Sequence, residues 1–473
     1  MNIALGIVIV YILVLYAVSW YATKLSKGGG YLGYLLAGRG FGPAIVATMI
    51  AGLAVGGAST IGVAEGAYKQ GLAAGWYNAA WAAGAIAAGF LVAEKFRQFE
   101  TTSVPEILER HFDTSGRVIG VFGQIVIQMV ITSLQYVAGG AILAALMPGI
   151  FTFQSGMMVS AVVFIGITLV GGYWAAGLSN IINVIVIYLG IVAGAAMVVS
   201  NAGGIGKVVA SLPASHPGFD LFAGLPMAII IAWFVVMLTQ AQSIQAVAQI
   251  AFAAKDGKRA KLGFILGGLI ILPAGFICAI FGIVAAAKFP GITPAMALPQ
   301  TLLELNPWVA GLALSGLWAA DVSTAVGLLL GSSTLVVNDI YKRFINPDVP
   351  EKQQMLISRL TVLAISALTY WMATYAVGII KTLLIGLTLT TSYTVVLLGL
   401  LFTPGLCKKG SAFWTLLTGI IFLALWQFVP AIRIVSHPIY LAWPVAIVTF
   451  LAVYLIDPRP ANVAGGANRT NAG

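Results

Sequence analysis

The sequence contains few charged residues, three histidines and two cysteines. Asp, Glu, Lys and Arg make up 8% of its 473 residues, roughly a third of the share in a typical soluble domain. The two cysteines, Cys278 and Cys407, are too few to hold a chain of this length together through a disulfide framework. The composition therefore excludes both an ordinary soluble domain and a disulfide-stabilised secreted fold.

Patterns typical of enzymatic sites are also missing. His111, His216 and His437 are each isolated, and none belongs to a metal-ligand spacing or a nucleophile–base pattern. The sequence contains no phosphate-binding glycine loop followed by Lys and Ser or Thr. We therefore predict that the protein is not an enzyme.

Long apolar segments dominate what is present. Hydrophobic residues make up 60% of the chain and the mean hydropathy is +1.00. Segments of about 20 apolar residues are long enough to cross a bilayer core of about 30 Å as helices. We predict an all-α membrane protein with a single polytopic domain over residues 1–473 and about 13 transmembrane helices. The predicted spans are 2–23, 42–69, 73–95, 118–146, 156–174, 178–201, 223–252, 260–288, 309–341, 357–377, 382–404, 411–430 and 438–456.

The basic residues indicate how these spans are oriented, because Lys and Arg collect in cytoplasmic loops. With the spans above, 19 of the 24 basic residues lie on one side of the membrane. The exceptions are Lys69, Lys207, Lys288, Lys381 and Arg433. We predict a multi-pass plasma membrane protein, in a prokaryotic cell membrane, with the N-terminus outside and the C-terminus in the cytoplasm. Lys24 and Lys27 follow the first apolar segment and no basic residue precedes it, which indicates a retained span. The net charge of +10 then reflects topology, and we expect no binding to nucleic acid.

Two spans are interrupted at comparable depth. The span at 42–69 contains Gly52, Gly56 and Gly57, which disfavour a continuous helix. The span at 223–252 contains the polar run Thr239, Gln240, Gln242, Ser243 and Gln245. This pairing predicts two inverted five-helix repeats with broken first helices, at about 42–201 and 223–404, with a binding site at the breaks. The peripheral helices would be 2–23, 411–430 and 438–456. Close helix packing by glycine and ordinary interhelical hydrogen bonds remain the alternatives.

Asp321 is a carboxylate in the middle of an apolar span, where a charge costs about 2.5–3.5 kcal/mol. Ala320, Ser323 and Thr324 share one face of the same helix. Oxygen ligands clustered inside a membrane indicate a hard cation. Asp321 could serve as a nearby charge that attracts the cation, as a ligand of a second ion, as a proton acceptor, or only as a partner of a neighbouring helix.

Candidates for contacting a solute lie around the two breaks. The backbone of Gly57, Ala58 and Ser59 could present free N–H groups to an anion. We place the side chains of Gln242, Ser243 and Gln245 opposite them and those of Tyr77 and Asn78 at the wall. A polar stripe of Gln124, Gln128, Thr132 and Gln135 is expected to face the same interior.

Two further segments have predicted local roles. Glu65 precedes Lys69 by four residues, which favours a structural ion pair over a gating role. In TTSVPEILERHF at 101–112, Ser103 and Pro105 introduce a short amphipathic helix that we expect to lie along the membrane surface.

Several segments resemble the sodium:solute symporter family in their order and spacing. They are YLLAGRGFG at 34–42, GGASTIGVAEGAYKQGL at 56–72, TTSVPEILERHF at 101–112, GGYWAAGLSNIIN at 171–183, AAKDGKRAKLG at 253–263 and SSTLVVNDIYKRF at 332–344. The GAYKQGL element is similar to the pantothenate-type branch. The resemblance implies a leucine-transporter-like fold and a principal sodium site between the broken second span and the ninth. Its ligands would be backbone carbonyls of Gly52, Val55 and Ala320 with the hydroxyls of Ser323 and Thr324.

The chain departs from the family pattern at two positions. Members commonly carry a Thr-Asp pair where this sequence has Ser179 and Asn180, and the position of Asp321 is usually apolar. The carboxylate beside the cation pathway is thus in the span at 309–341 instead of the span at 178–201. Its presence there favours a role for Asp321 as a nearby charge that attracts the cation.

We predict a secondary active transporter that couples Na+ to the symport of a small polar or anionic organic solute by alternating access. Its partners would be the solute and the lipid bilayer, with no obligate protein partner evident. The alternatives are a proton-coupled transporter that uses Asp321 and a sensory or channel-like membrane protein on the same scaffold.

Overall fold

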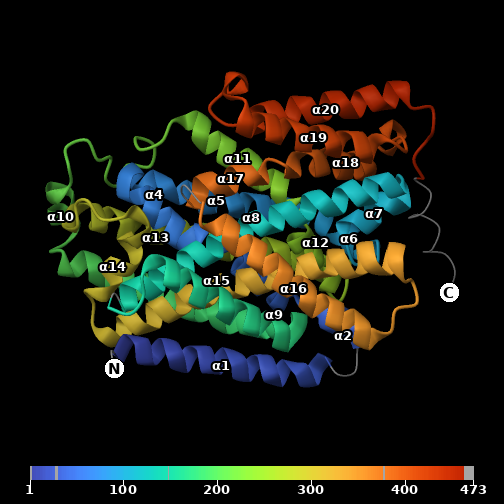
Figure 1. Ribbon diagram of the computed structural model, residues 1–473. Coiled ribbons are helices and arrows are strands. Elements are labelled where there is room, and N and C mark those ends of the chain that lie inside the picture. Colours follow the sequence, from blue (N-terminus) through green and yellow to red (C-terminus); the bar gives the residue numbers. More distant parts are fainter. Residues whose placement is uncertain (1–2, 27–29, 148, 376–378, 463–473) are drawn as a thin grey trace.

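The computed structural model describes residues 3–26, 30–147, 149–375 and 379–462. Within these ranges the chain is helical and forms no β-strand, which confirms the all-α prediction. Figure 1 shows the long helices crossing the molecule in roughly the same direction. The predicted spans 2–23 and 357–377 and the C-terminal tail each include residues outside the described ranges.

The helices of the first half reproduce the predicted spans with one merger and one break. They are α1 (Ile3–Ser26), α2 (Gly30–Leu36), α3 (Pro43–Ala54), the π-helical turn η2 (Ala58–Gly62), α4 (Val63–Gln70), α5 (Trp76–Ala88), α6 (Glu94–Gln98), α7 (Val104–His111), α8 (Thr114–Leu146), α9 (Phe153–Asn201) and α10 (Ile205–Ser211). The predicted spans 156–174 and 178–201 both lie in α9. Gly172 divides it through a backbone conformation, φ 60° and ψ −161°, that only glycine adopts readily.

The second half follows the same pattern. Its helices are α11 (Met227–Ala241), α12 (Gln245–Ala253), α13 (Gly257–Lys288), α14 (Ala297–Leu303), α15 (Pro307–Thr334) with its π-helical extension η6 (Leu335–Ile345), α16 (Glu351–Ala373), α17 (Ile379–Leu387), α18 (Thr390–Phe402), α19 (Ser411–Phe428) and α20 (Ile439–Ile456). α11 and α12 meet at a bend of 47°, and α17 and α18 at a bend of 41°. The second of these bends was not predicted from the sequence.

Side-chain caps explain why several helices begin where they do. Asp113 accepts a hydrogen bond from the Gly116 N–H (2.8 Å) before α8, and Asp256 accepts one from the Arg259 N–H (2.8 Å) before α13. Each carboxylate satisfies a backbone donor that has no partner inside its helix. These caps follow directly after the charged loops that separate the apolar segments.

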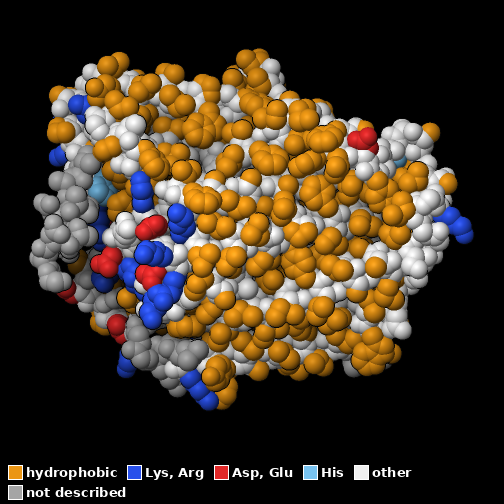
Figure 2. Space-filling model, turned by 180° about the vertical axis from the view of Figure 1, so that it is seen from behind, with side chains coloured by type: hydrophobic (Ala, Val, Ile, Leu, Met, Phe, Trp, Pro, Cys, Tyr) orange, Lys and Arg blue, Asp and Glu red, His pale blue; other side chains and the backbone are white. Residues whose placement is uncertain are grey.

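Length and apolar character identify the membrane-crossing helices. Among the described residues eight helices are long and apolar enough to cross a bilayer, or up to ten if each bent pair is one span. The count of 13 remains a prediction, because several predicted spans are broken or merged. Figure 2 shows a broad apolar face, with charged side chains gathered at one end of the molecule. That end carries α2 and α7, while α10 and α14 lie at the other (Figure 1).

α15 is the central helix of the structure. It packs against α1, α3, α8 and α9, and 94% of its most apolar window is buried. A helix so enclosed has almost no lipid contact, so its polar residues must find partners within the protein. The central position of α15 brings Asp321 next to the broken helix α3–α4.

Candidate functional site

The first helix break lies between α3 and α4. α3 ends at Ala54, Val55 has non-helical backbone (φ −88°, ψ 56°), and η2 begins at Ala58. The Gly57 N–H donates to Oε1 of Gln135 on α8 at 2.9 Å, and the Ser59 hydroxyl donates to the Ala54 carbonyl. The predicted interruption of this span is therefore confirmed.

The second break separates α11 from α12 and is held by the same helix α8. Gln124 donates from Nε2 to the Ser243 carbonyl at 2.8 Å, and its Oε1 accepts from the Gln245 N–H at 2.9 Å. Backbone groups released by a break inside a membrane must be paired within the protein. Gln124 and Gln135, two members of the polar stripe, each pair such groups at one break. All four stripe residues are buried, which confirms that the stripe faces the interior.

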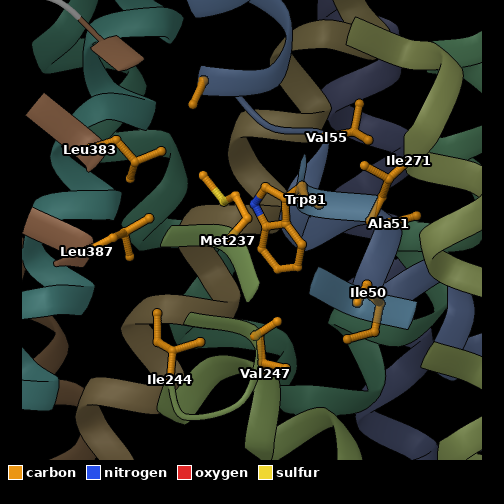
Figure 3. Close-up of a cluster of buried hydrophobic side chains, with 14 of the residues drawn as sticks. Ile50, Ala51, Val55, Trp81, Met237, Ile244, Val247, Ile271, Leu383 and Leu387 are labelled. Atoms are coloured by element: carbon orange, nitrogen blue, oxygen red, sulfur yellow. The ribbon is translucent and has the colours of Figure 1, made fainter. Parts of the chain in front are cut away.

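A central cavity of about 20 Å³ lies between the two breaks. Ala58 and Tyr77 line it, as predicted for solute contacts, together with Trp81, Gln135 and Gln240, which were not among the candidates. Figure 3 shows Trp81 in the middle of an apolar cluster, with Met237 beside it and Ile244, Val247 and Leu383 around it. The remaining lining residues are Leu53, Ala54, Gly56, Ile131, Ile244, Val247, Leu328 and Leu383. An apolar wall with a few amides and a phenol is typical of sites for small organic solutes. At this volume the cavity has room for about one water molecule, so the site is closed to such a solute in this structure.

The structure places the other predicted solute residues in different surroundings. Asn78 and Gln242 are buried, and their amide atoms have no hydrogen-bond partner among the described residues. The Ser243 hydroxyl donates to the Thr390 carbonyl on α18 at 3.2 Å. The Gln245 side chain accepts from the Val104 N–H at 2.8 Å and donates to the Thr102 carbonyl at 3.2 Å. Ser243 and Gln245 are thus committed to holding helices and loops together.

Two of the predicted cation ligands, Thr324 on α15 and Gly52 on α3, are in contact where these helices pack together. The Thr324 hydroxyl donates to the Gly52 carbonyl at 2.9 Å, and the Ser323 hydroxyl donates to the Ala320 carbonyl at 2.9 Å. Val55 lies at the start of the break between these helices. The structure therefore brings hydroxyl and carbonyl oxygens of both helices together.

Asp321 lies beside the same break. Its side chain is fully buried, and neither carboxylate oxygen has a hydrogen-bond partner in the described part of the chain. A Cβ added at Gly57 would lie 3.0 Å from Oδ1 of Asp321. The carboxylate thus faces the unwound segment.

A larger cavity of about 940 Å³ opens beyond the break. Its lining includes Glu65, Lys69, Lys381, Arg433 and His437. Glu65 accepts from the Ile379 N–H at 3.3 Å, and the described residues show no ion pair between Glu65 and Lys69. The predicted structural pair is therefore absent from this structure, and the basic residues outnumber Glu65 around this opening.

Comparison with known proteins agrees with this architecture. Residues 34–419 match the model of the sodium:solute symporter family. The high-affinity proline transporter PutP of Bacillus subtilis is 26% identical over 352 residues, which cover 70% of this chain and 73% of that protein. The sodium/proline symporter of Haemophilus influenzae is 26% identical over 381 residues, with 75% and 73% covered.

Solved structures show the same fold at low identity. A Na+-coupled sialic acid symporter in a substrate-bound outward-open state superposes with a TM-score of 0.79 at 17% identity, and the alignment covers 98% of this chain and 99% of that one. Mhp1, a nucleobase-cation-symport-1 family transporter, gives a TM-score of 0.61 at 14% identity, with 89% and 92% covered.

These broken helices and their enclosed polar site define a membrane transporter with the leucine-transporter-like fold. The chain belongs to the sodium:solute symporter family. It is a multi-pass plasma membrane protein that couples solute transport to Na+, and it is not an enzyme. Family membership favours sodium coupling over the proton-coupled and sensory alternatives.

Proposed function

We propose that this chain moves a small polar or anionic organic solute together with Na+ by alternating access, through the cavity where its two broken helices meet. The observation that carries the proposal is the meeting of both breaks at one cavity, with oxygen ligands from α3 and α15 beside it. Several relatives are proline transporters, which supports a solute of amino-acid size. Basic residues around the outer cavity would attract a carboxylate.

The sodium site proposed here uses the carbonyls of Gly52, Val55 and Ala320 and the hydroxyls of Ser323 and Thr324. The 2.9 Å bond from Thr324 to Gly52 supports it, because a cation between these atoms would replace that bond by direct coordination. Unwound backbone near Val55 leaves carbonyl groups available for the ion.

The proposed solute site centres on Ala58 and Tyr77, with Gln135 and Gln240 as additional polar contacts. The N–H of the candidate Gly57 is not free for a solute, because it donates to Gln135. The earlier candidates Ser59, Asn78 and Gln242 are buried nearby, whereas the bonds of Ser243 and Gln245 support a structural role for these two residues. A thermal-shift screen of amino acids and other small carboxylates tests the function. We expect stabilisation by at least one solute in NaCl and little in choline chloride. Equal stabilisation in both salts would contradict sodium coupling.

Ala58→Leu is expected to reduce uptake of the solute identified in that screen at least tenfold, because the cavity has no room for three additional carbon atoms. Na+-dependent stabilisation without solute should change little. Uptake into proteoliposomes under a Na+ gradient measures the effect. Ala87→Leu, on the partly buried outer side of α5, is the control and should transport normally. Normal transport by Ala58→Leu would place the solute elsewhere.

For the orientation we propose an external N-terminus and a cytoplasmic α7. α1 begins at the end that carries α10, opposite the end that carries α7 (Figure 1). A cysteine at Lys207 should react with an impermeant maleimide added to whole cells, and one at Lys258 only after the membrane is opened. The natural Cys278 and Cys407 are buried and should give little background. Labelling of both positions from the same side would refute this topology.

A further inference from the structure

Asp321 has no partner among the other residues of the described chain. Its carboxyl group is fully buried within α15, neither oxygen has a hydrogen-bond partner, and no Lys or Arg of the described residues forms an ion pair with it. A buried carboxyl group persists in a protein when it is protonated, paired or bound to a metal ion. The partner of Asp321, a proton or a cation, therefore comes from outside the chain.

Side-chain oxygens of three residues gather beside the glycine pair. A Cβ added at Gly57 would lie 2.5 Å from the Ala138 Cβ, 3.0 Å from Asp321 Oδ1 and 3.3 Å from Gln135 Oε1. The corresponding point at Gly56 lies 2.8 Å from Gln135 Oε1 and 2.6 Å from Thr324 Oγ1. The three oxygens therefore follow one edge of the glycine pair, and only glycine leaves this space unoccupied.

The orientation of Gln135 strengthens this reading. Its Nε2 donates to the Ile131 carbonyl at 3.1 Å, while its Oε1 accepts from the Gly57 N–H. The amide thus turns its oxygen, and not its NH2 group, toward the carboxylate. The Gly57 N–H fills one acceptor position of the Gln135 oxygen, and a cation between this oxygen and the Asp321 carboxylate would attract both.

We infer that Asp321, Gln135 and the unwound backbone at Gly56 and Gly57 form a second cation site, which takes Na+. The inference rests on the proposed sodium coupling and adds a second ion to it. One carboxylate with neutral oxygens matches a monovalent cation, because the filled site then has no net charge inside the membrane. Gln135 also lines the central cavity, so filling this site is linked to solute binding.

This site is separate from the proposed site between α3 and α15. The Ser323 hydroxyl donates to Ala320 and lines a different small cavity together with Ser179. Asp321 Oδ1 instead lies next to Gly57, 3.0 Å from the Cβ position there. Thr324 neighbours both sites, because its hydroxyl bonds the Gly52 carbonyl and lies beside Gly56.

Equilibrium binding of 22Na+ to the purified full chain in detergent, without any organic solute, tests the inference. We expect two Na+ per protein for the wild type and one for Asp321→Asn, which keeps the shape but removes the charge. Gln135→Leu should weaken the second Na+ at least tenfold while Asp321 remains in place. Asp348→Asn, an exposed carboxylate, is the control and should retain two.

Each result has a definite meaning. Two Na+ in a monodisperse Asp321→Asn protein would overturn the second site. One Na+ in both the wild type and Asp321→Asn would also overturn the second site, and Asp321 would then bind something other than Na+, such as an ammonium group of the solute. That result would leave the proposed function intact. No Na+ in the wild type would remove the proposed function itself. If Asp321→Asn does not fold, the Gln135→Leu result decides, and unchanged Na+ affinity there overturns the inference.

Discussion

Replacing Ser323 and Thr324 together by alanine is expected to raise the Na+ concentration for half-maximal uptake by about 100-fold or more, because two ligands are lost. Hydrogen-bonding oxygens that face a charge contribute about 1.5–3 kcal/mol each, and 1.4 kcal/mol corresponds to a factor of ten in affinity. The two hydroxyls lie at the crossing of α15 and α3, where Thr324 contacts the Gly52 carbonyl. Uptake into proteoliposomes at graded NaCl concentrations, with choline chloride as balance, measures the shift.

The matched control for this double variant is Ser315→Ala on the same helix. Ser315 is equally buried, and its hydroxyl donates to the Gly311 carbonyl of its own helix at 2.6 Å. Its loss removes a hydroxyl of the same kind away from the proposed ligands. We expect an unchanged Na+ dependence for the control and similar amounts of protein for both variants. Wild-type Na+ dependence in the double variant would show that the ion binds elsewhere.

The sequence predicted the helical framework well because membrane helices are defined by long apolar runs. α8, α13, α19 and α20 lie within a few residues of the predicted spans. The breaks were also visible, since Gly56 and Gly57 and the polar run near Gln242 are unusual inside apolar segments. These signals are local, so a single sequence contains them.

Contacts between distant segments could not be predicted in the same way. The polar stripe on α8 indicated an interior face, but only the fold shows that Gln124 and Gln135 pair the backbone at the two breaks. The bend between α17 and α18 lies in a Thr-rich segment, whose composition does not by itself predict a bend. Asp321 has no hydrogen-bond partner in the described part of the chain, and this too depends on which residues of distant segments surround it.

The amphipathic helix α7 shows the same limit. Its cap and start were predicted correctly, because Ser103 accepts from the Glu106 N–H at 3.1 Å. Its apolar side chains Val104, Ile107 and Leu108 are fully buried. The apolar side of α7 is therefore covered by protein, including α8, and not by lipid, while its orientation along the membrane surface stays a prediction. Hydrophobic periodicity identifies an apolar face but not what covers it.

Around α7, charged residues connect three segments at one end of the molecule. Arg117 of α8 donates from Nε to Oδ1 of Asp339 in η6 at 2.8 Å and also contacts Glu109 of α7. The Ser103 hydroxyl donates to the same Asp339 oxygen at 2.8 Å, and Arg343 pairs with Glu109 at 2.9 Å. Gln245 at the second break bonds the loop before α7. This network therefore joins α7 to the end of α15 and to the broken helix.

The charge of Glu109 is expected to persist over the whole neutral range. Burial by itself would raise the pKa of Glu109, but hydrogen bonds from Arg343, Arg117 and Thr114 lower it to about 2. A carboxyl group with a lowered pKa contributes stability above its ordinary pKa of about 4 and loses it as the pH falls toward the folded value. We therefore expect no change in stability from Glu109 between about pH 6.5 and pH 9, because this range begins about two pH units above the unfolded pKa, and a progressive loss as the pH falls from about 4 toward about 2.

Arg117→Met is expected to destabilise the protein by about 3–5 kcal/mol, because it leaves the buried Asp339 without its cation. The Arg117 side chain is 9% exposed and that of Asp339 is fully buried, so water cannot replace the lost partner. The double variant Arg117→Met with Asp339→Leu removes both charges and should recover much of the apparent melting temperature in detergent. Arg259→Met, which breaks a half-exposed pair with Asp256, should lower it by far less. An equal melting temperature for Arg117→Met and Arg259→Met would show that the charged network does not hold α7 against α15. The apolar contacts of Val104, Ile107 and Leu108 would then be what keeps α7 in place.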